Sequence, residues 1–202
     1  MAGLRERKKE QTRQRIAAVA LRLFTERGFD AVTVNEIAEA AEVAKATLFT
    51  YFPTKESLVL HGVGGDDLAG IAARRPPGQT FLEALRAHYR ALAAVQLPAA
   101  ELGALITRVR VIWDSPALQG AANDLLYQQR QELARVLAGE YGETAARLMA
   151  AQVAASLLTL QESYFQCLLD GTSPRDANRA LAQDAELAFD LLERGLSHLE
   201  GK

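Results

Sequence analysis

The sequence predicts an all-α protein of about nine helices. Alanine and leucine abound, 49% of the 202 residues are hydrophobic and only 6 are proline, a composition that favours helix. Apolar residues recur at three- and four-residue steps over most of the chain, whereas strand signals are nearly absent. Prolines and glycines fall between these segments, so short breaks should join the helices.

The first predicted helix runs from about residue 9 to the residue before Gly28. One apolar stripe defines it, formed by Ile16, Val19, Ala20, Leu23 and Phe24. Gly28 suits the left-handed conformation that ends many helices. We expect this helix mainly to support the two shorter helices that follow it.

Residues 33–55 carry the pattern of a helix-turn-helix. Thr33 followed three residues later by Glu36 is a capping box, which opens a short helix. A second helix is predicted at residues 44–51, because Pro53 disfavours helix in the residue before it. Leu48 should point inward, and the remaining faces are small, polar and aromatic. A helix of this kind can enter a DNA major groove with its first residues at base edges.

The stretch GFDAVTVNEIAEAAEVAKATLFTYFPTKESLV resembles the DNA-binding module of the TetR/AcrR family of bacterial transcriptional regulators, over about residues 9–60. The matching features are Gly28-Phe29, Thr33, Ile37-Ala38, Val43, Thr47-Leu48-Phe49, Tyr51-Phe52 and Lys55. One departure is Ala44, where the family often has a serine cap. The resemblance implies a three-helix helix-turn-helix DNA-binding domain at residues 1–53 and a helical effector-binding and dimerisation domain at residues 54–202.

The resemblance and the helix pattern together assign contacts to double-stranded DNA. Thr33 and Lys55 resemble phosphate contacts, whereas Lys45 and Thr47 are better placed for base edges. The full predicted set is Thr33, Asn35, Lys45, Ala46, Thr47, Phe49, Thr50, Tyr51 and Lys55. Structural alternatives stay open, since Thr47 can bond back to its own helix and Tyr51 can close the small core.

The charge distribution agrees with one end facing phosphate. The net charge is −2, but residues 1–55 carry ten Lys/Arg and seven Asp/Glu, a net +3, which leaves −5 for the rest. A basic N-terminal end on an acidic body suits a protein that contacts DNA at that end. The alternative is a basic tail that is merely solvated.

The rest of the chain reads as successive helices. A fourth helix is predicted from about Thr54, with a break near residues 61–65, where three glycines occur in four positions. Further helices are predicted at residues 80–95, 99–113, 116–141, 143–170 and 174–199.

Each of the last two predicted helices carries a row of apolar residues. In the final helix these residues are spaced alternately four and three positions apart, as in a heptad repeat, and such a row predicts packing against another helix in a homodimer. In TetR-like proteins two such helices from each chain form a four-helix bundle. The predicted interface is Met149, Val153, Leu157, Tyr164, Leu181, Ala185, Ala188, Leu192 and Leu199. The alternative is that both helices pack only within one chain.

The resemblance also implies a small-molecule effector among the middle helices. Candidate lining residues are His61, Tyr89, Arg110, Trp113, Tyr127, Gln161 and Tyr164. Arg108 and Arg110 lie on different faces of their helix, so at most one should point inward. An inward arginine would favour an anionic or acyl-type effector.

Enzymatic classes find no support in the sequence. No catalytic motif or nucleotide loop occurs, the three histidines match no metal spacing, and no cofactor is expected. Cys167 is the only cysteine, and neither a signal peptide nor a membrane span is visible, so we expect a cytoplasmic protein without a membrane partner.

Two functional hypotheses follow. The first is a transcriptional regulator, of repressor type, that binds a near-palindromic operator as a homodimer and is released by a small-molecule effector. The second is a helical small-molecule-binding or adaptor protein with vestigial DNA contacts, for which Ala44 and Ala46 are the best support. Neither the operator nor the effector can be named from the sequence.

Overall fold

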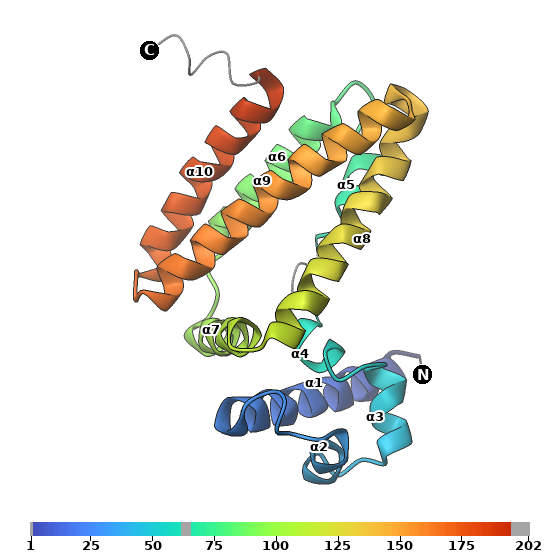
Figure 1. Ribbon diagram of the computed structural model, residues 1–202, viewed down its shortest axis with the longest axis vertical. Helices are drawn as coiled ribbons and strands as arrows, with labels where there is room; N and C mark the ends of the chain where they lie inside the picture. The colour runs from blue at the N-terminus through green and yellow to red at the C-terminus, as the bar shows by residue number, and fades with distance from the viewer. Residues whose placement is uncertain (1, 62–65, 195–202) are drawn as a thin grey trace. The chain divides into compact units, whose positions relative to one another are not determined.

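The computed structural model describes residues 2–61 and 66–194 (Figure 1). Every element in these ranges is a helix, which confirms the all-α prediction. The helices are α1 (Ala2–Arg27), α2 (Val34–Ala40), α3 (Lys45–Tyr51), α4 (Ser57–Leu60), α5 (Leu68–Ala73), α6 (Phe81–Ala94), α7 (Ala99–Trp113), α8 (Pro116–Tyr141), α9 (Glu143–Leu169) and α10 (Pro174–Arg194).

The chain forms two compact units that do not coincide with the predicted domains. Unit 1 comprises Met1–Gly65 and Ala100–Asn123, and unit 2 comprises Asp66–Ala99 and Asp124–Lys202. Unit 1 therefore contains most of α7 as well as the helix-turn-helix. The domain boundary predicted after residue 53 stays a prediction about function, because compactness divides the chain elsewhere.

Unit 1 is built around the apolar stripe of α1. Ile16 and Phe24 are almost fully buried and pack with residues of α2, α3 and α4 and with Ile112 of α7. Gly28 adopts φ +83° and donates its amide to the Phe24 carbonyl, so it ends α1 as predicted. The helix begins at Ala2, earlier than the predicted residue 9, because the basic N-terminal segment continues the same helix.

The predicted fourth helix is divided into α4 and α5, which raises the described number to ten. Thr54 does help to start α4, since its hydroxyl accepts a hydrogen bond from the Ser57 amide at 3.1 Å. The glycines of the predicted break, residues 62–65, lie outside the described residues.

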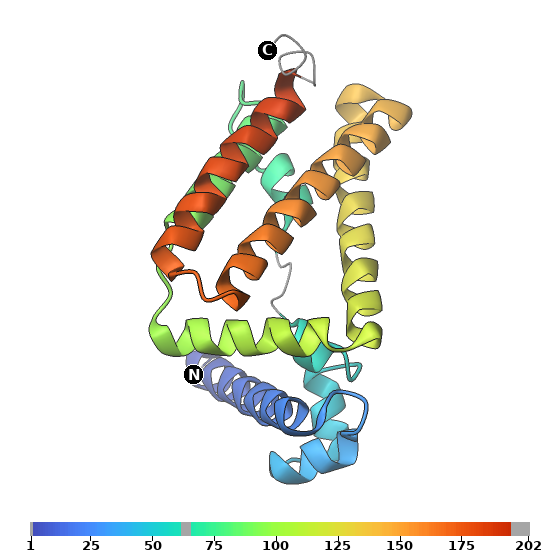
Figure 2. The ribbon, with the colours of Figure 1, turned by 60° about the vertical axis from the view of Figure 1, so that its left-hand side comes forward.

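Unit 2 is organised by α10, which packs against α6 and α9 (Figure 2). Phe189 of α10 is fully buried and lies beside the Tyr89 ring of α6. At the rim of this contact, Arg86 of α6 reaches three carboxylates of α10. Its guanidinium lies 2.7 Å from Asp190, 3.5 Å from Glu193 and 3.8 Å from Glu186.

This packing corrects four of the predicted dimer contacts. Val153, Leu157, Leu181 and Ala185 are at most 8% exposed inside a single chain, in the core of unit 2. The heptad row of α10 faces α6 and α9 of its own chain, so these side chains offer no free surface to a partner. Four other predicted contacts are partly buried against the same core, namely Met149, Tyr164, Ala188 and Leu192. Leu199 lies outside the described residues.

Candidate DNA-binding surface

The start of α2 is fixed by the predicted capping box, extended by an arginine. The Glu36 amide donates to the Thr33 hydroxyl at 3.3 Å, and the Glu36 carboxylate accepts from the Thr33 amide at 2.8 Å. The Thr33 hydroxyl donates to the same carboxylate at 2.7 Å, and Arg27 of α1 donates to its other oxygen at 2.8 Å. These hydrogen bonds, those from Thr33 first, lower the pKa of Glu36 from 4.5 to about 2.

The capping box bears on the role predicted for Thr33. The Glu36 carboxylate accepts hydrogen bonds from Thr33 and from Arg27. Thr33 is exposed, as a phosphate contact requires, but its single hydroxyl proton already points to Glu36. A phosphate would have to compete for that proton.

The turn between α2 and α3 is a Schellman motif with a glutamate in the left-handed position. Glu42 adopts φ 53°, its amide donates to Glu39 at 3.0 Å, and the Val43 amide donates to Ala38 at 2.9 Å. Glycine is the usual residue here, because a Cβ atom disfavours the left-handed region. The two backbone hydrogen bonds therefore hold the turn between α2 and α3, although no glycine occupies its left-handed position.

Leu48 is the fully buried residue that anchors α3 to the rest of unit 1, and Tyr51 packs partly against the same core. By contrast, Lys45, Ala46, Thr47 and the other predicted base contacts stay at the surface. The helix thus presents nearly its whole outer face. Ala44 precedes it in an extended conformation and supplies no side-chain hydrogen bond to the first turn, as the missing serine predicted.

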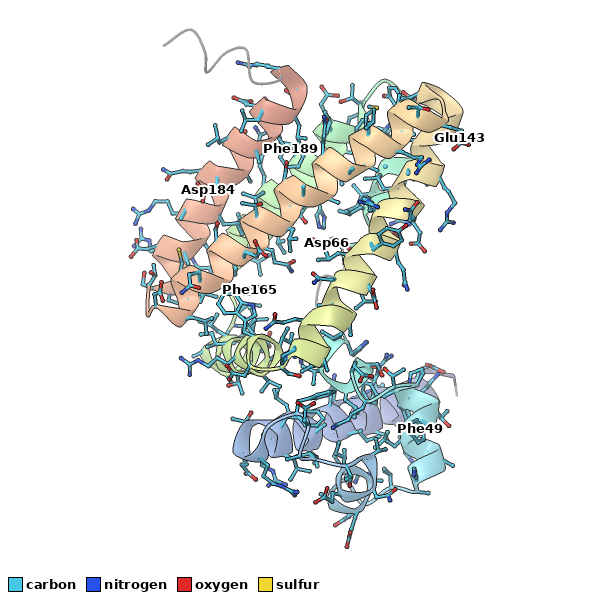
Figure 3. The ribbon with its side chains drawn as sticks, viewed as in Figure 1. Phe49, Asp66, Glu143, Phe165, Asp184 and Phe189 are labelled. Carbon is cyan, nitrogen blue, oxygen red and sulfur yellow. The ribbon has the colours of Figure 1, made fainter. Side chains whose placement is uncertain are left out.

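The remaining predicted DNA contacts on α3 differ in their exposure and in their hydrogen bonds within the protein. Phe49 is 39% exposed and lies on the surface of the helix (Figure 3). Thr50 donates its hydroxyl to the Ala46 carbonyl at 2.9 Å, so the back-bonding considered for Thr47 is made by Thr50. Tyr51 is half-buried against the core of unit 1.

Lys55 lies over the aromatic core rather than extended into solvent. Its ammonium nitrogen is 4.3 Å from the centre of the Phe29 ring and 5.8 Å from that of Phe24. The residue is half-buried, and a cation at this distance is attracted by the face of the ring. The ring therefore positions the positive charge that was predicted to meet a phosphate.

Arg13 joins the basic end of α1 to the residue that follows α4. Its Nη2 atom donates to His61 Nδ1 at 3.1 Å, and its guanidinium lies over the Phe52 ring. Arg108 of α7 donates to the His61 carbonyl at 3.2 Å. Burial lowers the pKa of His61, and the charges of Arg13 and then Arg108 lower it further.

The comparisons with known proteins agree with this geometry. Residues 16–61 match the sequence profile described as "Bacterial regulatory proteins, tetR family", and residues 79–197 match the profile of the "MftR C-terminal domain". The chain belongs to the TetR/AcrR family of bacterial transcriptional regulators. Its function class is therefore a DNA-binding regulator, and the family is not one of enzymes.

Individual relatives cover most of the chain. It is 34% identical to the transcriptional regulator TcmR of Streptomyces glaucescens over 69% of its own length and 65% of TcmR. It is 29% identical to the putative mycofactocin biosynthesis regulator MftR of Mycobacterium tuberculosis, over 96% of its own length and 95% of MftR. The repressor NalD of Pseudomonas aeruginosa shares the fold, with a TM-score of 0.57, 18% identity and coverage of 92% and 96%.

The effector candidates of this TetR-family chain are divided between the two units. His61, Arg110 and Trp113 belong to unit 1, whereas the other four belong to unit 2. Arg110 is exposed, whereas Arg108 is half-buried and burial lowers its pKa, so Arg108 is the more enclosed of the two; the effector role of Arg110 stays a prediction. Trp113 is 37% exposed rather than in the core.

In unit 2 two of the candidates are bonded to neighbours. The Tyr89 hydroxyl donates to Asp66 at 3.0 Å, and burial first and the Asp66 carboxylate second raise its pKa. His88 lies 2.8 Å from the same carboxylate. The Tyr164 hydroxyl donates to the Asn178 side chain at 3.0 Å. Sequence reasoning missed Asp66, because nothing local marks a residue whose partners lie more than twenty positions away.

The two remaining candidates differ in exposure. Gln161 is half-buried on α9 and Tyr127 is 55% exposed on α8. Among residues 2–61 and 66–194 no group of three or more metal-ligating side chains gathers. In the same ranges no single helix is long and apolar enough to cross a membrane, although α6 and α7 pass that test together as a bent pair.

Proposed function

We propose that this protein is a repressor that acts as a cytoplasmic homodimer on a near-palindromic operator and is released by a small-molecule effector. The observation that carries the proposal is the exposure of α3. Leu48 is fully buried and Tyr51 is half-buried against the core, whereas Lys45, Ala46 and Thr47 form an uncovered first turn. A single helix with this outer face fits the B-DNA major groove, which is about 12 Å wide.

The contacts divide into two kinds under this proposal. Lys45, Thr47 and Asn35 contact base edges, and Ala46 allows close approach or touches a thymine methyl group. Lys55 and the exposed basic residues of α1, such as Arg7 and Lys8, contact phosphate and give the salt dependence. Phosphate contacts fix the register of the protein, and α3 supplies the sequence preference.

The homodimer uses the outward faces of α9 and α10, because their inward rows are buried in one chain. Gln152, Ala155 and Thr159 form an exposed row of three- and four-residue steps on α9, and Leu187 of α10 is 52% exposed. Small side chains in such a row let two helices approach closely. A two-fold dimer then presents two copies of α3 to two half-sites.

The repressor part of the proposal draws support from relatives. The chain is 32% identical over 78 residues to the transcriptional repressor KstR of Rhodococcus jostii, and NalD is described as a repressor of an efflux pump. Release requires that the effector bind the arrangement that cannot bind DNA more tightly than the one that can.

Capture of genomic fragments by the purified chain tests this proposal. At about 0.15 M salt, where loose ionic contacts are weakened, we expect enrichment of a few fragments that contain an inverted repeat beside a promoter. The chain should lower transcription from such a promoter in a purified system. Enrichment of no fragment by folded protein would refute DNA regulation, and increased transcription would refute repression.

A further inference from the structure

A groove of about 290 Å³ lies between α8 and α9 within unit 2, and two arginines from different helices line it. Arg130 and Tyr127 come from α8, and Arg147, Leu148 and Thr144 come from the first turns of α9. The groove lies near Glu143, where α8 gives way to α9 (Figure 3).

The residues that line this groove include two arginines and no carboxylate. No ion pair of Arg130 or Arg147 occurs in the described part of the chain. A larger groove at α6 offers the contrast, since its Arg86 and Arg90 are already paired with carboxylates of α10. Of these two grooves, the α8–α9 groove is the one that keeps two guanidinium groups available to an external anion.

Tyr127 and Leu148 add an apolar and aromatic wall. The two residues are 55% and 61% exposed, so both are accessible to a ligand. The Arg130 guanidinium lies 4.7 Å from the centre of the Tyr127 ring and so forms a flat platform with it. A planar guanidinium suits a carboxylate, which it can bind through two parallel hydrogen bonds.

We propose that the α8–α9 groove binds a small aromatic carboxylate. The carboxylate lies between Arg130 and Arg147, and the ring packs against Tyr127 and Leu148. The volume is at the small end of pockets for organic ligands, roughly 300–1,000 Å³, and therefore suits one or two rings rather than a long chain. The site is a property of unit 2 and does not depend on DNA binding.

Calorimetric titration of the full chain with 2-naphthoate tests the site. We expect one ligand per chain, with affinity lowered at least about tenfold in Arg130→Gln and in Arg147→Gln, because each removes a charge-assisted contact. Arg135→Gln is the matched control, since Arg135 is an exposed arginine of α8 that does not line the groove. The neutral amide 2-naphthamide should bind at least about tenfold more weakly than 2-naphthoate.

Several outcomes would overturn the proposal. They are unchanged affinity in both glutamine variants, equal binding of the amide, and no binding to folded wild-type protein. Circular dichroism checks the fold, and Arg130→Lys and Arg147→Lys, which keep the charge but lose the paired hydrogen bonds, should bind with intermediate affinity. Loss of dimer in the double glutamine variant with naphthoate binding retained would assign the groove to a second chain instead.

Discussion

The Lys55 ammonium nitrogen lies 4.3 Å from the centre of the Phe29 ring, so the charge predicted to contact DNA is held by the hydrophobic core of unit 1. The methylene stem of Lys55 covers aromatic surface while the charged end stays partly accessible. One side chain therefore packs on the core and carries the charge that we propose to contact phosphate, and a substitution must separate the two roles.

Lys55→Met makes that separation, because methionine keeps an unbranched apolar stem and removes the charge. We expect binding to all duplexes to weaken alike, and the slope of log affinity against log salt to become shallower by about 0.9. The free energy of unfolding should fall by no more than about 1 kcal/mol, the size of a partly exposed cation–π contact. Arg175→Met, a charge removal on α10, is the control, and an unchanged slope would exclude the phosphate role.

Glu36 should make the start of α2 sensitive to acid. Its folded pKa of about 2 lies below the ordinary 4.5, so its stabilising effect is complete above about pH 4.5 and is lost as the pH falls toward 2. Glu36→Gln keeps a capping side chain without the titration. Urea unfolding at pH 6 and pH 3 should show the difference between wild type and this variant shrinking in acid. A difference between wild type and Glu36→Gln that stays constant between pH 6 and pH 3 would contradict this cause.

Glu42→Gly should stabilise the turn between α2 and α3. The residue holds φ 53°, where a side chain costs roughly 1–2 kcal/mol, whereas glycine loses roughly 0.5–1 kcal/mol through its freer unfolded state. We expect a net rise of about 0.5–1 kcal/mol in the free energy of unfolding, measured in urea. Glu42→Val should destabilise instead, since a β-branched residue tolerates this region least. A loss of stability in the glycine variant would show that the glutamate side chain itself contributes.

Ala155→Glu tests the outward face of α9 as the dimer surface. If α9 and α10 of two chains pack through these faces, the dimer would bury an unpaired carboxylate at position 155 in each chain, which strongly disfavours association. Sedimentation velocity should show monomers that retain the helical circular dichroism of wild type. Gln128→Glu, an exposed change on α8 outside the proposed dimer surface, serves as the control. A dimer that persists in Ala155→Glu would place the interface elsewhere.

Local signals predicted the DNA-binding helices well. The capping box, the inward Leu48 and the glycine end of α1 each depend on residues within one or two turns, and all three occur as expected. The turn at Glu42 was not predicted as a Schellman motif, because glutamate gives no sign of a left-handed conformation. Backbone hydrogen bonds to α2 hold it there despite its propensity.

The hydrophobic periodicity of the sequence did not predict which residues far apart in the chain contact one another. The heptad row of α10 shows that the helix packs along one side, but periodicity does not say whether the partner belongs to the same chain. Leu181 and Ala185 pack within their own chain, on the core that includes Phe81 of α6. In the same way, the choice between Arg108 and Arg110 depended on where α7 packs, which its own sequence does not state.

The ratio of two dissociation constants tests the central claim most directly, namely that the exposed face of α3 contacts bases. It compares the captured inverted-repeat duplex with a scrambled duplex of equal length at about 0.15 M salt. We predict that the captured duplex binds at least about 10³-fold more tightly, as specific regulators do. A ratio near one, with folded and dimeric protein, would contradict base recognition and favour the small-molecule-binding alternative with vestigial DNA contacts.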